Sequence, residues 1–142
     1  MKIPECFYRV SAKALVLNET KNKFLIIKED DDWWDIPGGG LDWKATPQLD
    51  IPREIDEEMS LEVTSISNTP SYFYTNSKPS KKNPEILIWY AYAVYETQLS
   101  NLDFKPSDEC VEIKFVDKDS LPMEKVHKQA LQLAEMFDPK NH

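Results

Sequence analysis

Extended, apolar segments dominate the pattern of hydrophobic and polar positions along the chain. Residues 8–17 begin with alternation and become continuously apolar, which is typical of a strand that runs from a sheet edge into a core. Residues 23–28, which are four apolar residues between two lysines, follow a polar turn and predict a second strand that pairs back on the first as a hairpin. Residues 86–96 are rich in β-branched and aromatic side chains and predict a central strand. Shorter strands are expected at 72–74 and 110–116.

Two segments have the spacing of helices instead. In the first, which starts at about residue 47 or 50 and ends near residue 60, Ile51, Ile55 and Met59 recur on one side. The second is a closing helix at 122–137, with Pro122 at an early helical position. The order strands, helix, strands, helix predicts an α/β (α+β) fold, and 142 residues is the length of a single domain, 1–142.

Pro52 decides where the first helix is expected to begin. A start at Pro47 would place Pro52 in the helix interior, where proline costs about 3 kcal/mol because it lacks an N–H and clashes with the preceding turn. A start with Asp50 as the N-cap places Pro52 in the first turn, where the N–H has no helical partner in any case. We therefore predict the later start, in which the Asp50 side chain accepts the backbone N–H of Arg53.

The charge balance and the cysteines restrict the class of protein. Seventeen Lys and Arg against 25 Asp and Glu give a net charge of −8, which argues against a protein that binds nucleic-acid polymers. The sequence contains no run of about 18 apolar residues and does not begin with an apolar signal segment, so we expect no membrane association. Cys6 and Cys110 are far apart and lack the spacing of metal ligands, which favours reduced thiols and a cytoplasmic location.

All three glycines of the chain are adjacent, at residues 38–40. Glycine is needed where the backbone adopts a positive φ or where another group approaches it closely. Three glycines are also few, because average usage is about 7%. The triplet could form an ordinary tight turn, but the concentration of all the glycine in one place marks this loop as a candidate site.

A group of acidic residues follows the glycines on the first predicted helix, in the run REIDEE at 53–58. Residues three and four apart share a helix face, so Glu54 points the same way as Glu57 and Glu58. Three carboxylates on one stripe repel one another unless a cation neutralises them, and Mg²⁺ takes oxygen ligands of this kind together with substrate phosphates. The alternative is a solvated acidic surface, which is the commoner meaning of such a cluster.

Taken together, the two motifs resemble the signature of the Nudix hydrolase family. That signature is Gly, five residues, Glu, seven residues, Arg-Glu, an aliphatic residue, any residue, Glu-Glu, any residue, Gly and an aliphatic residue. It falls on Gly39, position 45, the run 53–59, position 60 and Leu61. The preceding WDIPGG resembles the lead-in of the family, and the later SDECVEIKFV and DSLP resemble its last core strand and the turn into its final helix.

The resemblance implies a Nudix-like mixed β-sheet sandwiched between helices. It also implies hydrolysis of a nucleoside diphosphate linked to another group, in which water attacks a phosphorus atom and Mg²⁺ or Mn²⁺ is the cofactor. The expected partner is a small nucleotide or diphosphate substrate, and a homodimer remains open.

The resemblance also assigns roles to individual residues. Those assigned to the metal are Gly38, through its carbonyl, Glu54, Glu57 and Glu58, and those assigned to catalysis are Arg53, Glu54, Glu57, Glu58 and Glu109. Glu57 either binds the metal or is held by Arg53 in an ion pair one turn apart. The general base stays open between Glu54, Glu109 and metal-bound hydroxide.

Two positions depart from the signature, because Ala45 replaces its first glutamate and Ser60 replaces the glycine after the helix. Serine adopts the positive φ of a helix end less readily than glycine, so we expect strain or a different helix end. The loss of a carboxylate at Ala45 weakens the metal site unless Asp42 or Asp50 replaces it. We predict an uncompensated site, in which Ala45→Glu raises Mg²⁺-dependent turnover. The same loss leaves open a second function, a Nudix fold that binds a nucleotide without hydrolysing it.

Several side chains outside the signature have a weaker claim to a role. Lys78, Lys81 and Lys82 lie on the polar segment 75–84, which is predicted to be a loop, and either contact phosphates or only solubilise the loop. His127 has no partner in the sequence and is expected at the surface. The aromatic residues that either stack on a base or simply pack are Trp33, Trp34, Trp43, Phe73 and Tyr74.

Overall fold

The computed structural model describes residues 5–142, which form eight strands, two α-helices and one 3-10 helix. In chain order the elements are β1 (Arg9–Leu15), β2 (Phe24–Lys28), β3 (Trp34–Asp35), β4 (Gly38–Gly40), α1 (Pro47–Met59), β5 (Val63–Ile66), β6 (Tyr72–Pro79), β7 (Leu87–Leu99), β8 (Glu112–Val116), α2 (Lys128–Met136) and η1 (Pro139–Asn141). The order strands, helix, strands, helix agrees with the sequence pattern, and β5 is a strand that the pattern did not predict.

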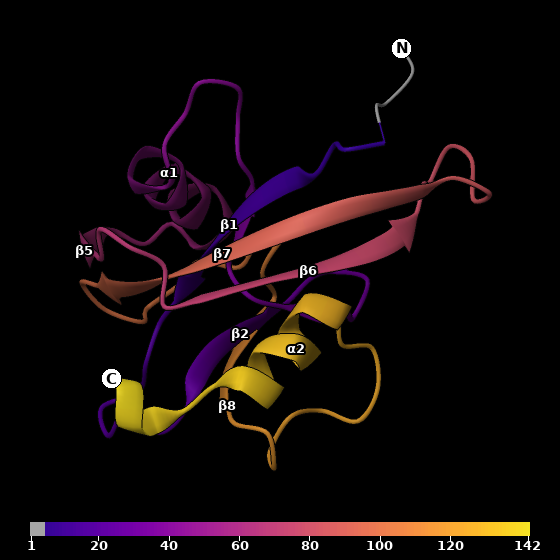
Figure 1. Ribbon diagram of the computed structural model, residues 1–142. Coiled ribbons are helices and arrows are strands. Elements are labelled where there is room, and N and C mark those ends of the chain that lie inside the picture. The colour runs from indigo at the N-terminus through magenta and orange to yellow at the C-terminus, as the bar shows by residue number, and fades with distance from the viewer. Residues whose placement is uncertain (1–4) are drawn as a thin grey trace.

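The long strand β7 lies at the centre of a five-stranded sheet, as the apolar run at 86–96 predicted (Figure 1). β1 pairs with β7 in parallel, with Ala12 opposite Ala93, and β4 pairs antiparallel with β1. β6 and β5 both pair antiparallel with β7. The five consecutive residues from Ala91 to Tyr95 are buried, because both faces of β7 are covered at this point.

A second, three-stranded sheet in the order β3-β2-β8 shares its core with the first. The expectation that β2 pairs with β1 as a hairpin is wrong, since β2 pairs antiparallel with β3 and β8 and meets the chain after β1 at one isolated bridge, Leu17–Phe24. The physical reason is burial on two sides. The consecutive residues from Phe24 to Ile27 are all buried, so β2 needs cover on both faces.

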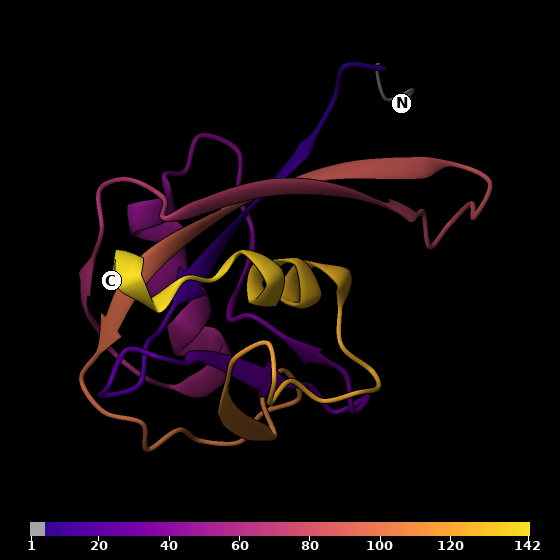
Figure 2. The same ribbon diagram turned by 60° about the horizontal axis from the view of Figure 1, so that its bottom comes forward.

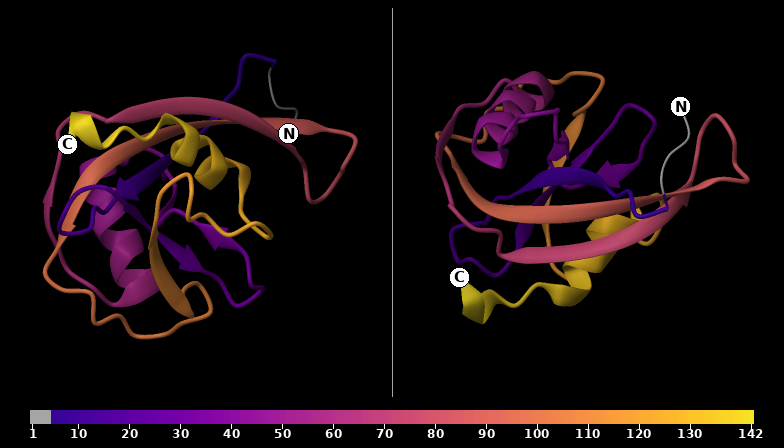
Figure 3. Two further views of the ribbon diagram at one scale, coloured as in Figure 1. Left: turned by 90° about the horizontal axis from the view of Figure 1, so that it is seen from below. Right: turned by 45° about the horizontal axis from the view of Figure 1, so that its top comes forward.

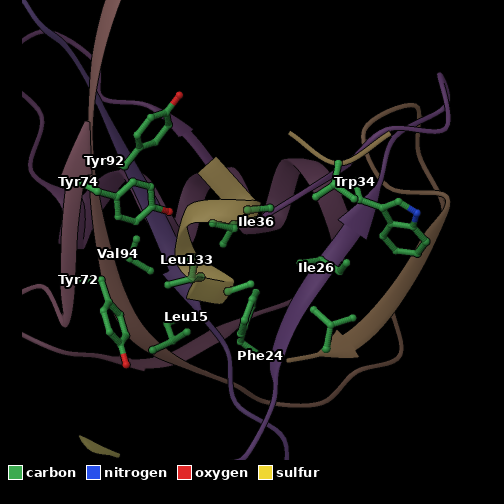
Figure 4. Packing of buried hydrophobic residues seen from close by; sticks show 14 residues of the cluster. Leu15, Phe24, Ile26, Trp34, Ile36, Tyr72, Tyr74, Tyr92, Val94 and Leu133 are labelled. Carbon is green, nitrogen blue, oxygen red and sulfur yellow. The ribbon is translucent and has the colours of Figure 1, made fainter. Parts of the chain in front are cut away.

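The two helices cover opposite faces of the large sheet, and the expected α+β arrangement of a mixed sheet between helices is confirmed (Figure 3). α1 packs Ile51 and Ile55 against small residues of β1 and β7 on one face. On the other face, Leu133 of α2 belongs to one buried cluster with Leu15 of β1 and Val94 of β7, and Phe24 and Ile26 of the small sheet complete this core (Figure 4). Within residues 5–142, no helix has both the length and the apolar character needed to cross a membrane.

The first helix begins earlier than predicted, at Pro47, so the expected start at Asp50 is wrong. The carbonyl oxygen of Thr46 accepts the N–H of Asp50 at 3.0 Å, and Pro52 lies inside the helix. Proline at the first helical position is favourable because its missing N–H needs no partner there. The cost of Pro52 is offset by the burial of Ile51 in the core and by the bonds that Asp50 accepts from Asp42 and Arg53.

The closing helix is shorter than predicted, and Pro122 lies outside it. The chain before α2 is held in an extended conformation by β3, since Trp34 and Val126 form a parallel bridge. The N–H of Trp34 donates to Lys125, and the N–H of His127 donates to Trp34, at 2.8 and 3.0 Å. These backbone bonds to β3 replace the helical bonds that the apolar spacing suggested.

The strand β6 is longer than predicted, so the expected loop over 75–84 is partly wrong. β6 stays paired with β7 to its last residue, Pro79, and the hairpin projects beyond the helices (Figure 2). Lys78 therefore lies in a strand, whereas Lys81 and Lys82 lie at the turn of the hairpin.

Candidate functional site

The glycine triplet, residues 38–40, forms the short strand β4 at an edge of the sheet and not the tight turn that the sequence allowed, although we keep the name glycine loop for it. Its glycines are required because two neighbouring elements approach them closely. Gly38 has a φ of +120°, and a Cβ atom there would lie 2.4 Å from the carbonyl oxygen of Ala12 in β1. A Cβ atom at Gly39 would lie 2.9 Å from Oε1 of Glu54, so the missing side chain leaves the space that this carboxylate occupies. The loop is therefore shaped around a carboxylate of α1 and is more than a tight turn.

The helix α1 places Glu54 and Glu58 one turn apart, both against the glycine loop. Oε1 of Glu58 accepts the backbone N–H of Gly38 at 2.9 Å, and Glu58 is only 7% exposed. Burial raises the pKa of Glu58 to about 8, although the Lys13 ammonium opposes this shift. Burial also raises the pKa of Glu54, against the opposing charge of Arg53. Two desolvated carboxylates side by side require protons or a cation.

Glu109 adds to the same negative cluster from a distant part of the chain. It is exposed in the turn before β8, and its charge contributes to the raised pKa values of Glu54 and Glu58. Oγ of Ser107 attaches this turn to the end of α1 by donating to the carbonyl oxygen of Glu58 at 2.7 Å. The structure therefore brings Glu109 near the carboxylates with which the resemblance groups it.

Arg53 binds the carboxylates around the outer edge of this cluster. Nη1 donates to Oε1 of Glu57 at 3.0 Å, which confirms the predicted ion pair and contributes most to raising the pKa of Arg53. Nη2 lies 3.1 Å from Oδ2 of Asp42, 3.3 Å from Oδ1 of Asp50 and 3.2 Å from Oε1 of Glu54. The structure therefore shows the ion pair of Glu57 with Arg53, and the expected role of Glu57 at the metal stays a prediction.

Asp50 joins the loop to the helix and does not cap α1. It is buried inside the helix at 6% exposure, so the predicted capping role is wrong. Oδ2 of Asp50 accepts the backbone N–H of Asp42 at 2.9 Å, while Oδ1 accepts Nη2 of Arg53. A carboxylate from the first part of α1 is therefore present near Arg53 although Ala45 supplies none.

Two residues between Gly39 and Leu61 adopt a positive φ without being glycine. Ser60 ends α1 with a φ of 56°, and its N–H donates to the carbonyl oxygen of Asp56. Lys44, in the loop before the helix, has a φ of 66°. The chain thus keeps a left-handed helix end at Ser60, at a cost of roughly 1–2 kcal/mol for a residue with a Cβ atom.

The glycine loop and the α1 carboxylates fit a hard divalent cation. Their donors are oxygens, which Mg²⁺ and Mn²⁺ prefer. The close approach of Glu54 to Gly39 and the burial of Glu58 both concentrate negative charge at one point. The carbonyl oxygen of Gly38, the further ligand expected from the resemblance, accepts Nζ of Lys13 at 3.3 Å, so one of its lone pairs is already in use.

A line of buried polar side chains that sequence reasoning missed leads away from the glycine loop. Nζ of Lys13 lies 3.3 Å from Oδ2 of Asp35 and also donates to the carbonyl oxygen of Gly38. Nε2 of Gln129 in α2 donates to the same oxygen of Asp35 at 2.9 Å, and Oε1 of Gln129 accepts Nζ of Lys78 at 2.5 Å. The available signal was Lys13 itself, a charged residue in the apolar part of a buried strand.

Glu29, Asp35 and His127 form a further polar group beside this line, with ligand atoms all within 4.8 Å of one another. The expected surface position of His127 is wrong, because its ring is half-buried and lies at a tilt against the ring of Trp33, with a centroid distance of 5.0 Å. Burial raises the pKa of Glu29 and lowers the pKa of His127. Asp35 of this group is already paired with the Lys13 ammonium, at 3.3 Å.

The fold and the site together define a class of protein in which a mixed sheet lies between two helices and the carboxylates of one helix gather beside a glycine segment. A family model described as the NUDIX domain matches residues 7–137, and the chain belongs to this family. The prediction of a Nudix-type diphosphate hydrolase is thereby confirmed at the level of the family.

Solved structures of Nudix proteins show the same fold. The MutT NUDIX hydrolase of Burkholderia pseudomallei is 21% identical, with 90% of this chain and 95% of that chain covered and a TM-score of 0.67. The MutT protein of Methanosarcina mazei is 23% identical, with 98% and 99% covered and a TM-score of 0.67. An ADP-ribose pyrophosphatase of Streptococcus suis is 22% identical, with 90% of each chain covered and a TM-score of 0.54. No curated protein sequence matches the chain.

Proposed function

We propose that the protein is a Mg²⁺- or Mn²⁺-dependent hydrolase of a small nucleoside diphosphate linked to another group. The observation that carries the proposal is the pair Glu54 and Glu58, which lie against a loop without side chains and are desolvated enough to have raised pKa values. A hard divalent cation at such a site usually shares its coordination with the phosphates of a substrate. The carbonyl oxygen of Gly38 is retained as a further proposed ligand.

The carboxylates have different proposed roles. Glu54 and Glu58 hold the cation, which, when bound, polarises the diphosphate oxygens and lowers the pKa of a water molecule. Arg53 and Glu57 keep the helix face in place through their ion pair. The side chain of Glu109 makes no hydrogen bond or ion pair to residues 5–142 and is exposed, so it is free to take a proton from the attacking water.

The substrate class is supported by charge and by one relative in fold. A net charge of −8 disfavours long polyanions but is compatible with a small diphosphate that binds together with a cation. The relative from Streptococcus suis is described as an ADP-ribose pyrophosphatase, which makes nucleoside diphosphates joined to a sugar the first compounds to test.

A panel of ADP-ribose, nucleoside diphosphate sugars and dinucleoside polyphosphates, incubated with Mg²⁺ or Mn²⁺, tests the proposal. We expect chromatography to show release of a mononucleotide or of phosphate from at least one compound. Glu54→Gln should abolish the release, whereas Asp56→Asn, an exposed residue of the same helix, should not. No product from any compound with either metal would contradict the proposal.

A nucleotide sensor is the second candidate function, and Ala45 is the observation that favours it. A domain that binds without turnover should show a melting temperature that rises with nucleotide and Mg²⁺, because a ligand bound only by the native state raises stability. This rise without any product would select the sensor.

We also propose a cytoplasmic location, which is supported by Cys6 and Cys110, both free thiols in the structure. The homodimer remains a prediction that light scattering of the purified protein would test.

A further inference from the structure

Lys13 is a charged residue in the apolar part of β1, and it is only 5% exposed. Ala12 and Ala14, on either side of it, belong to the core under α1, so Lys13 alternates onto the face that α2 covers, as Leu15 does. In the pairing of β1 with β4, Lys13 lies directly opposite Gly38. A buried ammonium costs free energy unless its donors are bonded, so the partners of Lys13 indicate its role.

All three donors of the Lys13 ammonium are used, and two of them go to backbone carbonyls at the start of the glycine loop. Nζ donates to the carbonyl oxygens of Ile36 at 3.2 Å and Gly38 at 3.3 Å, and to Oδ2 of Asp35 at 3.3 Å. Two carbonyl oxygens that approach one point repel each other, and a positive charge between them replaces the repulsion by attraction. The ammonium therefore stabilises the bend of the chain at Pro37.

Asp35 fixes the ammonium in place and balances its charge. Oδ1 of Asp35 accepts the N–H of Ile36 at 2.7 Å, and Oδ2 also accepts Nε2 of Gln129 at 2.9 Å. The carboxylate is thus held both by its own segment and by α2. Because the two charges cancel, Lys13 holds the glycine loop without adding a net positive charge beside a cation.

Gly38 is bonded from both faces of the sheet as a result. Its carbonyl oxygen accepts Nζ of Lys13 from the side of α2, and its N–H donates to Oε1 of Glu58 in α1 at 2.9 Å. Glycine has more conformational freedom than any other residue, so these contacts, and no side chain of its own, set the direction of its backbone groups. A change in that direction would move the proposed carbonyl ligand and the donor that fixes Glu58 together.

We propose that Lys13 is a positioning residue of the cation site, whose ammonium sets the direction of the Gly38 backbone and so prepares the glycine loop and Glu58 for a divalent cation. The inference rests on the proposed function, in which this site holds Mg²⁺ or Mn²⁺. Stability alone does not explain the ion pair of Lys13 with Asp35, because replacing a buried pair by uncharged residues of similar size is often neutral or stabilising. Lys13 acts through Gly38 in this assignment and contacts neither the cation nor the substrate.

The backbone amide of Gly38 can be observed by itself, because Gly38 is the only glycine that follows a proline. Protein labelled with ¹³C-carbonyl proline and ¹⁵N-glycine gives one resonance in an HNCO spectrum, that of the Pro37–Gly38 peptide. The hydrogen-exchange rate of this amide, divided by the rates of the other two glycine amides, reports on the loop and not on global stability. Calorimetry of the metal-free protein gives the Kd for Mg²⁺ and for Mn²⁺.

Two variants remove the ammonium. Lys13→Met leaves Asp35 buried without its cation and risks failing to fold. The double variant Lys13→Met with Asp35→Asn removes both charges, so it contains no unpaired carboxylate at this point. Leu15→Val is the matched control, because Leu15 is the next residue of β1 on the same face and is fully buried in the core that α2 closes.

In the double variant we expect the Gly38 exchange ratio and the Kd for both cations each to rise about tenfold, the effect of one lost hydrogen bond to a charged group. Lys13→Met should show the same two changes if it folds. Leu15→Val should lower the melting temperature and leave the exchange ratio and both Kd values unchanged. A purely structural role for Lys13 would give the pattern of Leu15→Val.

An unchanged exchange ratio in the double variant would overturn the proposal, as would an equal rise in Leu15→Val, because a general loosening of β1 would then explain it. A raised exchange ratio with unchanged Kd values would also overturn it, since Lys13 would then shape the loop without affecting the cation. If the parent binds neither Mg²⁺ nor Mn²⁺, the proposed function fails. The exchange ratio then decides on its own whether Lys13 sets the direction of Gly38.

Discussion

The backbone N–H of Gly38 donates a hydrogen bond of 2.9 Å to Oε1 of Glu58, which follows it by 20 residues. The bond fixes a buried carboxylate of α1 against the loop and leaves its second oxygen free of this donor. Glu58 is thereby positioned by the fold itself, and a cation that binds there does not have to order its side chain.

The stability of the metal-free protein should fall as the pH rises from about 4.5 to about 8. The pKa of Glu58 is raised from 4.5 to about 8, so the folded protein binds more protons than the unfolded chain across this interval. The stabilising contribution is complete below the lower value and is lost as the pH passes the upper one. Melting temperatures measured in chelator should show this slope, and Glu58→Gln should flatten it. The rise in melting temperature on adding Mg²⁺ should increase over the same interval, because protons compete with the cation. An identical slope in Glu58→Gln would contradict the assignment.

Glu54→Gln and Glu58→Gln are each expected to remove most of the Mg²⁺-dependent turnover. Each change deletes a charge from a cluster in which like charges raise one another's pKa values, so the metal-free variants should be no less stable than the parent. Steady-state kinetics and metal-free thermal unfolding measure the two effects. Full turnover in either variant, or a clear fall in its metal-free melting temperature, would count against this arrangement.

Alanine substitutions in the glycine loop should separate stability from activity. Gly38→Ala places a Cβ atom 2.4 Å from a backbone oxygen at a φ of +120°, so we expect severe destabilisation. Gly39→Ala instead meets the end of the flexible Glu54 side chain, which can move aside. It should cost little stability but lower turnover and metal affinity, because Glu54 is displaced. Equal effects of the two substitutions on both properties would refute the distinction.

Asp50→Ala should destabilise the protein by about 1–3 kcal/mol, because the buried side chain accepts the N–H of Asp42 and the guanidinium of Arg53.

Ala45→Glu, which the sequence alone predicts to raise turnover, should leave turnover near the parent value. Arg53 already contacts four carboxylates, among them Asp50 of the first part of α1, so its charge is balanced without a further carboxylate. Urea unfolding and kcat/KM measure the two outcomes. A large gain in turnover for Ala45→Glu, with no stability lost in Asp50→Ala, would restore the prediction of an uncompensated site.

Ser60→Gly and Lys44→Gly should each stabilise the protein by about 1 kcal/mol, because glycine adopts a positive φ without steric cost. Lys118→Gly is the matched control, since Lys118 is exposed and is not among the residues with a positive φ. It should give no gain, because glycine loses more conformational freedom on folding. Equal effects at all three positions in thermal unfolding would show that strain is not relieved.

The fold could be predicted where an element buries one face, or where a long run of consecutive residues is apolar. The central position of β7 and the apolar faces of both helices followed from such patterns. The partner of β2 could not be predicted, since a strand buried on both faces fits several neighbours equally well. The start of α1 was wrong because the local cost of Pro52 was weighed without the burial of Asp50 and Ile51, which only the tertiary structure supplies.

The signature supplied the contact between Arg53 and Glu57, because helical spacing determines which side chains meet. It gave no indication of Gln129, whose two ends connect β3 to β6 through bonds between residues far apart in the sequence. The segment 75–84, which contains Lys78, was predicted to be a loop because its residues are mostly polar, as the residues of a turn are. Its position in β6 depends on the length of pairing with β7, which composition does not set.

The amide of Gln129 has a further consequence for the charges around it. Its N–H group faces the carboxylate of Asp35 and its oxygen faces the ammonium of Lys78, so the side chain acts as an electrically neutral spacer between two opposite charges. An apolar side chain at this position would leave the ammonium of Lys78 without this acceptor and the carboxylate of Asp35 without this donor. The ammonium of Lys78 is thereby held by the dipole of an amide, while the carboxylate of Asp35 remains paired with Lys13.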